Sequence, residues 1–592
     1  MIYQLLKTQA DDTPDNVALC APDRADLTYR ALISQVELVI NALVAKGVPA
    51  SGPAAVVLPN GPEMAIAILG TTAMAFCAPL NPTFSHREFD FYFNDINPRA
   101  LITMSGMNSP AREIAKQRDI PVIELTPALD AAAGIFTIPG AKQTLGADVR
   151  FARNNDCALL LHTSGTTSRP KMVPLTHENL LASCQNIART LRLTNLDRCL
   201  NVMPLFHIHG LVGALLSSFM AGASIVCTSS FNVEEFLPWL ERFRPTWYTA
   251  VPTIHHAVLS AAQKNREALR NNSLRFIRSS SSALPIQVME GLEQIFKVPV
   301  IESYGMTEAA HQMTSNPLPP GKRKAGSVGV AAGPEVAVVD QSGKRLSSGE
   351  TGEVAIRGVN VMGGYANNSD ANETSFTQGW FKTGDQGYFD QDGYLFITGR
   401  LKEIINRGGE KIAPREVDAV LMQHPAVVQA VAFAVPHPTL GEDIAAAIVL
   451  QPDSQASVRD IREFAATKLA QFKVPRQIVV VDAIPLGATG KITRNSLAQT
   501  LSDQLQSTSG ATQNEFQDAL ADIFGEVMGI ERVSLTDNFF ALGGDSLRAS
   551  QILNRIRSRF DVNLTIATVF QKSTVAELTE EILRAIGDTE SS

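Results

Sequence analysis

The sequence predicts an α/β protein followed by two smaller parts, one of mixed helices and strands and one a separate acidic segment. Three observations carry this prediction. Apolar, strand-like runs alternate with helical patterns through most of the chain, which is typical of helices packed on a mostly parallel sheet. From about Gly352 short strands with turns replace this pattern, and a compact α+β pattern follows Leu401. The last segment is acidic and follows a small polar stretch.

The predicted elements can be read from the apolar runs and their periodicity. The helical pattern Val233 to Phe243 lies between strand-like runs of the first part. These runs cover residues 157–164, 223–230, 275–282 and 299–305. The short strands cover residues 352–358 and 387–400, and the α+β pattern covers residues 414–435 and 460–475. We find no internal repeat of fixed period.

Length and composition indicate a multidomain globular chain. At about 150 residues per domain, 592 residues correspond to roughly four domain-sized units. The formal net charge of −8, from 51 basic and 59 acidic residues, argues against a nucleic-acid partner, which would favour a basic surplus. The six cysteines form no CxxC pair, so we expect neither disulfides nor a zinc site, and a reducing cytoplasm fits.

Neither a signal peptide nor a membrane span is expected. The N-terminal residues lack a basic segment followed by an apolar run. The most apolar stretch, Met64 to Leu80, is interrupted by Gly70 and Pro79, so we expect a buried helix and strand there. These features predict a soluble, cytoplasmic protein without a membrane partner.

The C-terminal tail differs from the rest of the chain in charge. Residues 514–592 contain 13 acidic and 7 basic residues, so this short segment holds most of the net negative charge. The preceding stretch QSTSGATQ, residues 506–513, has the composition of a flexible linker. We therefore expect a separate, small, acidic domain.

A loop rich in hydroxyls is the first chemical signal. The segment Thr163 to Lys171, TSGTTSRPK, follows an apolar strand, and its small residues would leave backbone N–H groups free to wrap a polyphosphate. Lys171 would add a positive charge. A lone Ser/Thr/Gly-rich loop is more often a simple turn, and this one is not the GxxxxGK[ST] motif.

Four further motifs follow in order. They are YGMTE (residues 304–308), WFKTGD (380–385), GRLKEIINRGGEK (399–411) and PLGATGK (485–491). With the hydroxyl-rich loop, their order and spacing resemble the adenylate-forming superfamily of acyl-CoA synthetases, peptide-synthetase adenylation domains and luciferases. The resemblance runs from the N-terminus to the linker. It implies an ATP-dependent, Mg²⁺-dependent ligase that activates a carboxylic acid as acyl-AMP before forming a thioester.

The resemblance also implies a nucleotide site. The β- and γ-phosphates would contact Thr163, Ser164, Gly165, Thr166, Thr167 and Lys171. Tyr304 would stack on adenine beside Gly305 and Ser281, and Thr307 would contact the α-phosphate. Asp385 and Arg400 would bind the ribose hydroxyls, and Glu308 would ligate Mg²⁺. One departure is Met172, where relatives often carry Gly.

Two further features of the family concern its second half-reaction. The segment after Arg400 would be a small domain that rotates about Lys402 between the two steps. In one orientation Lys491 would bridge the carboxylate and the α-phosphate. In the other, Gly408 and Gly409, which lack a Cβ, would let a pantetheine arm pass close to the backbone. The same two glycines also fit a simple tight turn.

The tail contains the segment DNFFALGGDSL, which ends at Ser546 and Leu547. Apolar residues then recur at helical spacing up to Phe560, which predicts an amphipathic helix beginning at the serine. Ser546 and Asp545 could be ordinary helix caps. The acidic, linker-tethered segment nevertheless resembles the acyl or peptidyl carrier family. That resemblance implies an all-α four-helix carrier domain in which a phosphopantetheinyl transferase attaches 4′-phosphopantetheine to Ser546.

The acid is the least determined feature. The segment Met203 to Leu211, MPLFHIHGL, lacks the Asp that amino-acid-activating domains use, so an α-amino acid is disfavoured. The runs PLFHIHGLVGALLSS, TWYTAVPTIHH, LRFIRSSSSALP, YGMTEAAHQMTSNPLPPG and KEIINRGGEKIAP resemble the oxalate–CoA ligase group. This resemblance implies an acyl pocket with His207, which is also a catalytic candidate, and with His209, Ser280, the Ser280–Ser282 loop and His311. A gating role for His207 and a purely structural His311 remain open.

We therefore expect residues 1–400 to form an adenylation core and 401–505 a mobile subdomain. Residues 506–513 would be a linker and 514–592 a carrier domain. The predicted function is ATP-dependent activation of a small carboxylic acid and its thioesterification onto the protein's own carrier, feeding downstream condensing or tailoring enzymes of a nonribosomal peptide or polyketide-type pathway. Alternatives are an acyl-CoA ligase that releases acyl-CoA, with CoA as acceptor, an amino-acid-activating didomain, and a non-catalytic AMP-binding protein.

Overall fold

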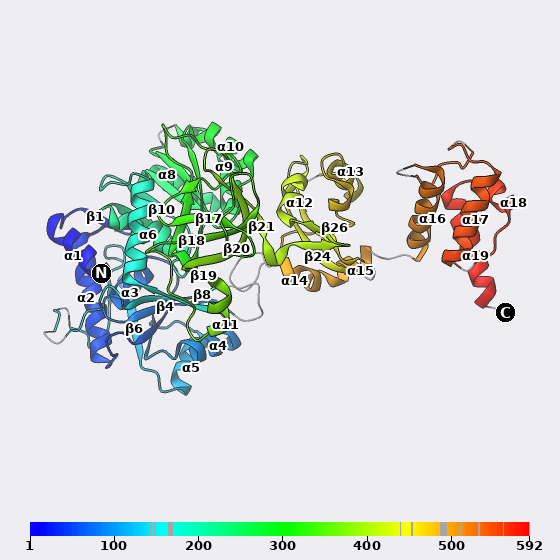
Figure 1. Cartoon of the computed structure of the whole chain (residues 1–592). Coiled ribbons are helices and arrows are strands. Elements are labelled where there is room, and N and C mark those ends of the chain that lie inside the picture. The colour runs from blue at the N-terminus through cyan, green and yellow to red at the C-terminus, as the bar shows by residue number, and fades with distance from the viewer. Residues whose placement is uncertain are drawn as a thin grey trace. The chain divides into compact units, whose positions relative to one another are not determined.

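The computed structural model divides the chain into two compact units, Met1–Ala498 and Gln499–Ser592. We describe each unit by itself (Figure 1). The structure describes residues 1–142, 144–146, 149–163, 170–270, 272–437, 440–451, 454–485, 494–508, 512–530, 533–540, 542–560 and 562–590.

The first unit contains a large mixed sheet with a parallel centre. Its strand order is β16-β15-β14-β13-β12-β10-β11-β1-β2, and the strands from β14 to β1 run parallel to one another. The bounds are β1 Val17–Cys20, β2 Leu27–Thr28, β10 Arg198–Asn201, β11 Ser224–Cys227, β12 Trp247–Ala250, β13 Phe276–Ser279, β14 Val300–Met306, β15 His311–Ser315 and β16 Val330–Ala331.

A second sheet has the order β7-β6-β5-β3-β4-β8-β9 and is parallel from β6 to β8. Its outer strands, β7 and β9, pair antiparallel with their neighbours. The bounds are β3 Pro53–Val57, β4 Phe76–Pro79, β5 Ala100–Met104, β6 Val122–Pro127, β7 Phe136–Thr137, β8 Cys157–Thr163 and β9 Lys171–Thr176. The two parallel-centred sheets confirm the predicted α/β class.

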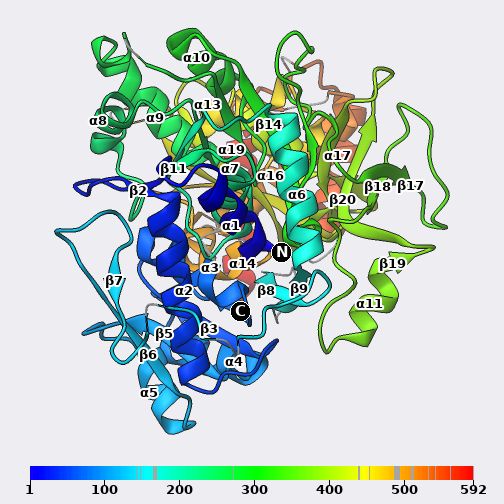
Figure 2. The ribbon, with the colours of Figure 1, turned by 90° about the vertical axis from the view of Figure 1, so that its left-hand side faces the viewer.

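One hydrophobic core joins these two sheets. It contains Leu19 of β1 and Leu159 of β8 together with side chains of α2, α3 and α6. Figure 2 shows α2 and α3, in blue, next to each other, and α6 in cyan. The helices are α1 Ile2–Asp12, α2 Tyr29–Ala45, α3 Pro62–Thr72, α4 His86–Ile96, α5 Pro110–Gln117, α6 His177–Thr190, α7 Ser217–Met220, α8 Val233–Phe243, α9 Pro252–Lys264, α10 Ile286–Phe296 and α11 Ser369–Ser375. Short helical turns are η1 His209–Leu216, η2 Glu267–Leu269 and η3 Thr307–Ala309.

Helix α6 illustrates how local sequence sets an element in place. Thr176 accepts a hydrogen bond from the Asn179 backbone N–H, and the Asn179 side chain accepts one from the Thr176 N–H, which completes a capping box. The same Asn179 side chain donates to the backbone oxygens of Val359 and Val361. The start of α6 is thereby tied to the segment that precedes α11.

Two smaller sheets follow the large ones. The first is antiparallel, with β17 Glu335–Val339, β18 Gly352–Arg357, β19 Phe376–Thr377, β20 Trp380–Phe389 and β21 Leu395–Arg400. The second contains β22 Ile405–Arg407, β23 Glu410–Ile412, β24 Val427–His437, β25 Gly441–Leu450 and β26 Gln477–Val480. Its helices are η4 Leu401–Glu403, α12 Pro414–Leu421, α13 Val458–Ala466, η5 Gln471–Lys473 and α14 Arg494–Thr500. The predicted changes of pattern near Gly352 and after Leu401 are confirmed.

The second unit is helical. Its elements are α15 Ser502–Thr508, α16 Thr512–Met528, α17 Ser546–Phe560, α18 Ile566–Gln571 and α19 Val575–Glu590. Leu520, Ile552, Val569 and Leu578 contribute to one small core shared by the last four helices. Helical residues stand at both ends of the predicted linker 506–513, and residues 509–511 lie outside the described part.

The predictions for two helices and for one buried stretch are confirmed. Helix α8 has the predicted bounds, and α17 begins at Ser546. The apolar stretch from Met64 forms the buried α3 and β4. All six cysteines are free thiols. Within the described residues, no helix is long and apolar enough to cross a membrane.

Candidate functional site

The predicted phosphate loop closes a hairpin between β8 and β9. Thr163 ends β8, Lys171 begins β9, and the two residues pair across the hairpin. Ser164, Gly165, Thr166 and Thr167 lie outside the described residues.

Met172 has a structural explanation. Its side chain is buried in the core of the second sheet, and its backbone oxygen accepts a hydrogen bond from Ala366 N–H at 3.0 Å. The bulky side chain therefore anchors the end of the loop where relatives often carry Gly.

Lys171 and Glu308 are linked through Tyr365. The Lys171 Nζ lies 4.4 Å from the centre of the Tyr365 ring, and the Tyr365 hydroxyl donates to Glu308 Oε1 at 2.8 Å. Glu308 lies with Thr307 in η3 and is buried. Burial lowers the pKa of Lys171, and the nearby Lys402 lowers it further. Sequence reasoning missed Tyr365, because nothing in its neighbourhood marks it as functional.

The carboxylate of Glu308 fits a magnesium ion carried by a nucleotide. Mg²⁺ is usually held by one or two carboxylates and by phosphate oxygens rather than by an all-protein cage. In the part of the chain that the structure describes, no group of three acidic, His or Cys side chains could hold a metal ion. The single buried carboxylate of Glu308, linked through Tyr365 to Lys171 of β9, fits this mode of binding.

Tyr304, Asp385 and Arg400 form a connected group. Asp385 and Arg400 are paired residues on β20 and β21. Asp385 Oδ1 accepts from Arg400 Nε at 2.9 Å, and its Oδ2 accepts from the Tyr304 hydroxyl at 2.5 Å. The Asp385 side chain is only 4% exposed. The carboxylate raises the pKa of Arg400, and burial with the Asp385 charge raises that of Tyr304.

Gly305 is required by close packing of two strands. A Cβ built on this residue would lie 1.9 Å from the backbone oxygen of His311. The β14–β15 pairing also shifts register between Tyr304 and Gly305. The glycine therefore places Tyr304 and His311 on neighbouring strands at close range.

His209 is held by hydroxyls at both ring nitrogens. Its Nε2 lies 2.6 Å from Thr249 Oγ1 of β12, and its Nδ1 lies 3.0 Å from Ser281 Oγ. Ser281 adopts a φ of +74°, an unusual backbone conformation for a residue with a side chain. Ser280 is buried and donates to the Ser303 backbone oxygen, so its hydroxyl is used within the protein.

The predicted acyl-site histidines are not equivalent. The His209 and His311 rings lie edge to face, with 5.2 Å between their centres. His207 stands just before η1, and its ring centre lies 4.7 Å from that of Phe206. His209 and His311 are thus brought together with Ser281, while His207 has its own aromatic neighbour.

Arg278 is a residue that sequence reasoning missed. It lies on β13, it is fully buried, and its Nη2 is 3.5 Å from His311 Nδ1. Arginine inside a strand expected to be buried was the available signal, since a buried charge requires a partner or a function.

Three residues predicted for the second half-reaction lie in η4 and in the sheet that contains β22 to β26. Lys402 belongs to η4, and Gly408 and Gly409 form the turn between β22 and β23 with φ of +58° and +100°. Both glycines therefore adopt a conformation that disfavours side chains. Lys491 lies outside the described residues.

Ser546 is exposed at the first position of α17. The Asp545 side chain accepts from the Arg548 backbone N–H at 2.8 Å, so the aspartate rather than the serine caps the helix. A Cβ on Gly544 would lie 2.4 Å from the buried Phe539 ring, which explains this glycine. The serine hydroxyl is thereby left at the surface.

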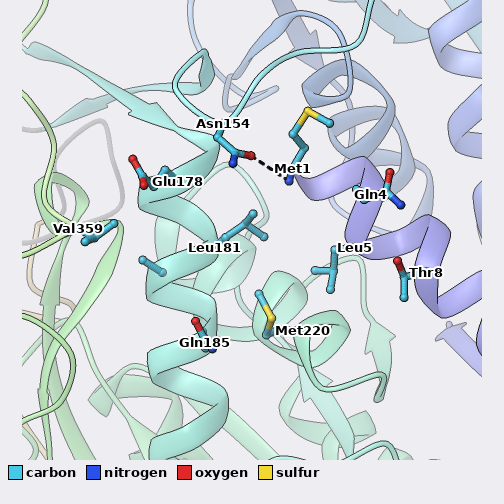
Figure 3. A pocket seen from close by; sticks show the side chains of 11 residues that line it. Met1, Gln4, Leu5, Thr8, Asn154, Glu178, Leu181, Gln185, Met220 and Val359 are labelled. Atoms are coloured by element: carbon cyan, nitrogen blue, oxygen red, sulfur yellow. Dashed lines mark hydrogen bonds between the residues drawn. The ribbon is translucent and has the colours of Figure 1, made fainter.

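A surface hollow of about 520 Å³ between α1 and α6 is separate from this site (Figure 3). Met1, Leu5, Glu178 and Leu181 are among its lining residues, and none of the predicted site residues belongs to it.

Comparison with known families matches three parts of the chain. The family of AMP-binding enzymes matches residues 6–366, its C-terminal domain matches 416–491, and a phosphopantetheine attachment site matches 518–582. Oxalate–CoA ligase of Arabidopsis thaliana is 43% identical over 84% of this chain and 97% of its own length. Oxalate–CoA ligase of Saccharomyces cerevisiae is 42% identical over 82% of this chain and 95% of its own length.

Solved structures agree with this assignment. ATP-bound MatB from Rhodopseudomonas palustris superposes with a TM-score of 0.78 at 28% identity, over 85% of this chain and 99% of its own. O-succinylbenzoate CoA synthetase from Bacillus subtilis, solved with ATP and magnesium ion, has a TM-score of 0.72 at 30% identity, over 83% of this chain and 98% of its own. The chain belongs to the AMP-binding enzyme family. It is an adenylate-forming, ATP-dependent acid–thiol ligase that carries a phosphopantetheine attachment domain.

Proposed function

We propose that this enzyme activates a small carboxylic acid without an α-amino group and loads it onto phosphopantetheine at its own Ser546. The acyl group would then enter a nonribosomal peptide or polyketide-type pathway. The observation that carries this proposal is the exposed Ser546 at the start of α17, in the same chain as an adenylate-forming enzyme.

The first half-reaction joins two anions. The acid's carboxylate oxygen attacks the α-phosphorus of ATP, the bond to the β-phosphate oxygen breaks, and acyl-AMP and pyrophosphate result. Lys171, Lys491 and the magnesium ion near Glu308 would offset the negative charge that accumulates in this step. Tyr304, Asp385 and Arg400 would hold the adenosine, and Thr307 would contact the α-phosphate.

The second half-reaction forms a thioester. The pantetheine group supplies a thiol at the end of a flexible arm. Its sulfur attacks the acyl carbon, the bond to AMP breaks, and the thiol proton is released. Lys402 would act as the hinge, and the Gly408–Gly409 turn would border the arm. A carrier in the same chain is present at an effective concentration of about millimolar, which favours loading within the molecule.

The acid's class is supported by the pocket and by relatives. Burying an ammonium group without a carboxylate partner would cost several kcal/mol, and Met203–Leu211 contains no carboxylate. The group that contains His209, Ser281 and His311 would instead suit a small polar acid. Relatives include oxalate–CoA ligases and a sulfoacetate–CoA ligase of Cupriavidus necator that is 34% identical.

The test is intact-mass analysis of the whole protein. After treatment with CoA and a phosphopantetheinyl transferase, wild type should gain one arm, and addition of ATP and an acid panel should add one acyl group. Ser546→Ala should gain neither. Ser550→Ala, four residues later on the same helix, should behave as wild type. If wild type gains no arm, the carrier assignment is wrong. If wild type carries the phosphopantetheine arm but gains no acyl group, and free acyl-CoA forms instead, the CoA ligase is favoured.

A further inference from the structure

Tyr365 connects two residues that are expected to act on the same nucleotide. The Lys171 Nζ lies 4.4 Å from the centre of its ring, and its hydroxyl donates to Glu308 Oε1 at 2.8 Å. Tyr365 is buried, so both contacts are made inside the protein. Because the aromatic ring is rigid, a single side chain sets the spacing between a lysine proposed for the phosphates and a carboxylate proposed for magnesium.

The main chain of Tyr365 is fixed by α11. Its N–H donates to Asn372 Oδ1 at 2.7 Å, and its carbonyl oxygen accepts from Asn372 Nδ2 at 2.9 Å. Gly364 adopts a φ of +147°, and a Cβ on this residue would lie 3.1 Å from Asn372 Oδ1. A glycine is therefore favoured directly before Tyr365, because it lets the chain approach the asparagine closely.

The residues around Tyr365 bind the same two segments through their main chains. Ala366 N–H donates to the Met172 backbone oxygen of β9 at 3.0 Å, and Met362 N–H donates to the Glu308 backbone oxygen of η3 at 2.8 Å. These bonds already hold the two segments together. The side-chain contacts of Tyr365 come in addition, and they involve a charged group on each segment.

The two side-chain contacts leave both charged groups usable. A carboxylate has about four lone-pair positions on two oxygens, so one hydrogen bond from Tyr365 orients Glu308 without saturating it. The ring face attracts the Lys171 ammonium through the ring quadrupole, which consumes none of its three N–H donors. Lys171 can therefore be held in place and still donate to phosphate oxygens.

We propose that Tyr365 is a positioning residue for the magnesium-bound nucleotide, whose hydroxyl orients Glu308 toward the metal and whose ring holds Lys171 beside the phosphates. This inference rests on the roles proposed above for Lys171 and Glu308. It adds the residue that keeps the lysine and the carboxylate at a fixed spacing.

The experiment measures nucleotide binding and does not depend on turnover. Calorimetry follows the titration of the full-length protein with α,β-methylene-ATP, in EDTA and across a series of magnesium concentrations, without any acid. In wild type magnesium should tighten binding, and in Glu308→Gln this effect should largely disappear. In Tyr365→Phe, half-maximal tightening should require about tenfold more magnesium, as expected when one hydrogen bond to a charged group is lost. Excess magnesium should restore the wild-type affinity, and the affinity in EDTA should be unchanged because the ring remains.

Two further variants complete the comparison. Tyr365→Leu removes both contacts, so it should also weaken binding in EDTA by about threefold to tenfold, the range of one cation–π contact. Tyr394→Phe is the matched control. Tyr394 also has a lysine over its ring, with Lys324 Nζ 4.6 Å from the ring centre, and its hydroxyl donates to the Lys322 backbone oxygen at 2.5 Å. It is not among the residues proposed to contact the nucleotide, so this variant should bind as wild type does.

Each outcome tests a separate step. A wild-type magnesium requirement in Tyr365→Phe would overturn the inference. An equal loss of affinity with and without magnesium would also overturn it, because a merely structural tyrosine would produce that result. If Glu308→Gln keeps the full magnesium effect, the metal assignment of Glu308 is wrong and the inference fails with it. None of these measurements requires an acid or a loaded Ser546, so the proposed function is tested independently.

Discussion

The Tyr304 hydroxyl donates to the carboxylate of Asp385 at 2.5 Å, although 81 positions separate the two residues. This contact joins the large sheet, through β14, to the small antiparallel sheet, through β20. Asp385 also accepts from Arg400, so the three residues expected to bind one adenosine are held in place by hydrogen bonds to one another. Ordering these groups in advance reduces the entropy that nucleotide binding must overcome.

The first prediction concerns this group. Asp385→Asn should raise the KM for ATP by about tenfold to a hundredfold, because hydrogen bonds to a charged group contribute roughly 1.5–3 kcal/mol. ATP–pyrophosphate exchange at saturating acid measures the change. Asp392→Asn, in the exposed turn between β20 and β21, is the matched control and should leave the KM for ATP unchanged. An effect on the KM for the acid alone would argue against a nucleotide role.

The second prediction concerns Lys491. Lys491→Ala should slow acyl-AMP formation by about two to three orders of magnitude, since removing one donor at a transition-state charge costs a few kcal/mol. Transfer from supplied acyl-adenylate should persist. Lys468→Ala, an exposed lysine that donates to Gln423, should affect neither step. If both half-reactions of Lys491→Ala slow equally, the two-orientation mechanism is wrong.

The third prediction concerns Gly409 and the second half-reaction. Gly409→Leu should block thioester formation while acyl-AMP still forms, because the side chain would obstruct the pantetheine path. Gly393→Leu is a matched control, since this turn glycine also has a positive φ and open space around it. Quenched-flow detection of acyl-AMP and of loaded carrier separates the steps. Equal thioester loss in the Gly393 variant would indicate backbone strain as the cause.

The fourth prediction concerns His311. His311→Ala should raise the KM for the acid more than the KM for ATP, because the ring that packs against His209 is removed while Tyr304 and Asp385 remain. Steady-state exchange with varied acid and varied ATP measures both values. His86→Ala, an exposed histidine at the start of α4, serves as control. If the KM for ATP rises more than the KM for the acid, His311 has a structural role rather than a role in binding the acid.

The fifth prediction concerns pH. Burial raises the pKa of Glu302 from 4.5 to about 7. The folded state then binds this proton more tightly than the unfolded state, so stability from this group is full below pH 4.5 and decreases as the pH rises to 7. At about 1.4 kcal/mol per pKa unit, the loss is roughly 3 kcal/mol.

Glu302→Gln should abolish this decrease, because the amide oxygen can still accept from Leu284 N–H without ionising. Urea unfolding at pH 5 and pH 8 measures the free energy of unfolding. The fluorescence of the three tryptophans, Trp239, Trp247 and Trp380, reports the first unit alone. Exposed Glu290→Gln should follow wild type. A wild-type stability that rises between the two pH values relative to Glu302→Gln would show that the carboxyl is ionised in the folded state.

The sequence by itself determined the local elements and the motifs. Helix α8, the start of α17 and the buried stretch after Met64 follow from periodicity, which depends only on neighbouring residues. Turn glycines such as Gly409 were also visible, because a positive φ is a local property. The order of the motifs indicated the family, and the comparisons confirmed it.

Only the tertiary structure decided which side chains meet. Strand order and register bring Tyr304 to Asp385 and Arg278 to His311. They also bury Met172 in the core of the second sheet. These are set by packing between segments that lie far apart in the chain, and no local pattern encodes them. Arg278 shows the same dependence, because the fold buries it completely and two of its N–H groups have no hydrogen-bond partner among the described residues.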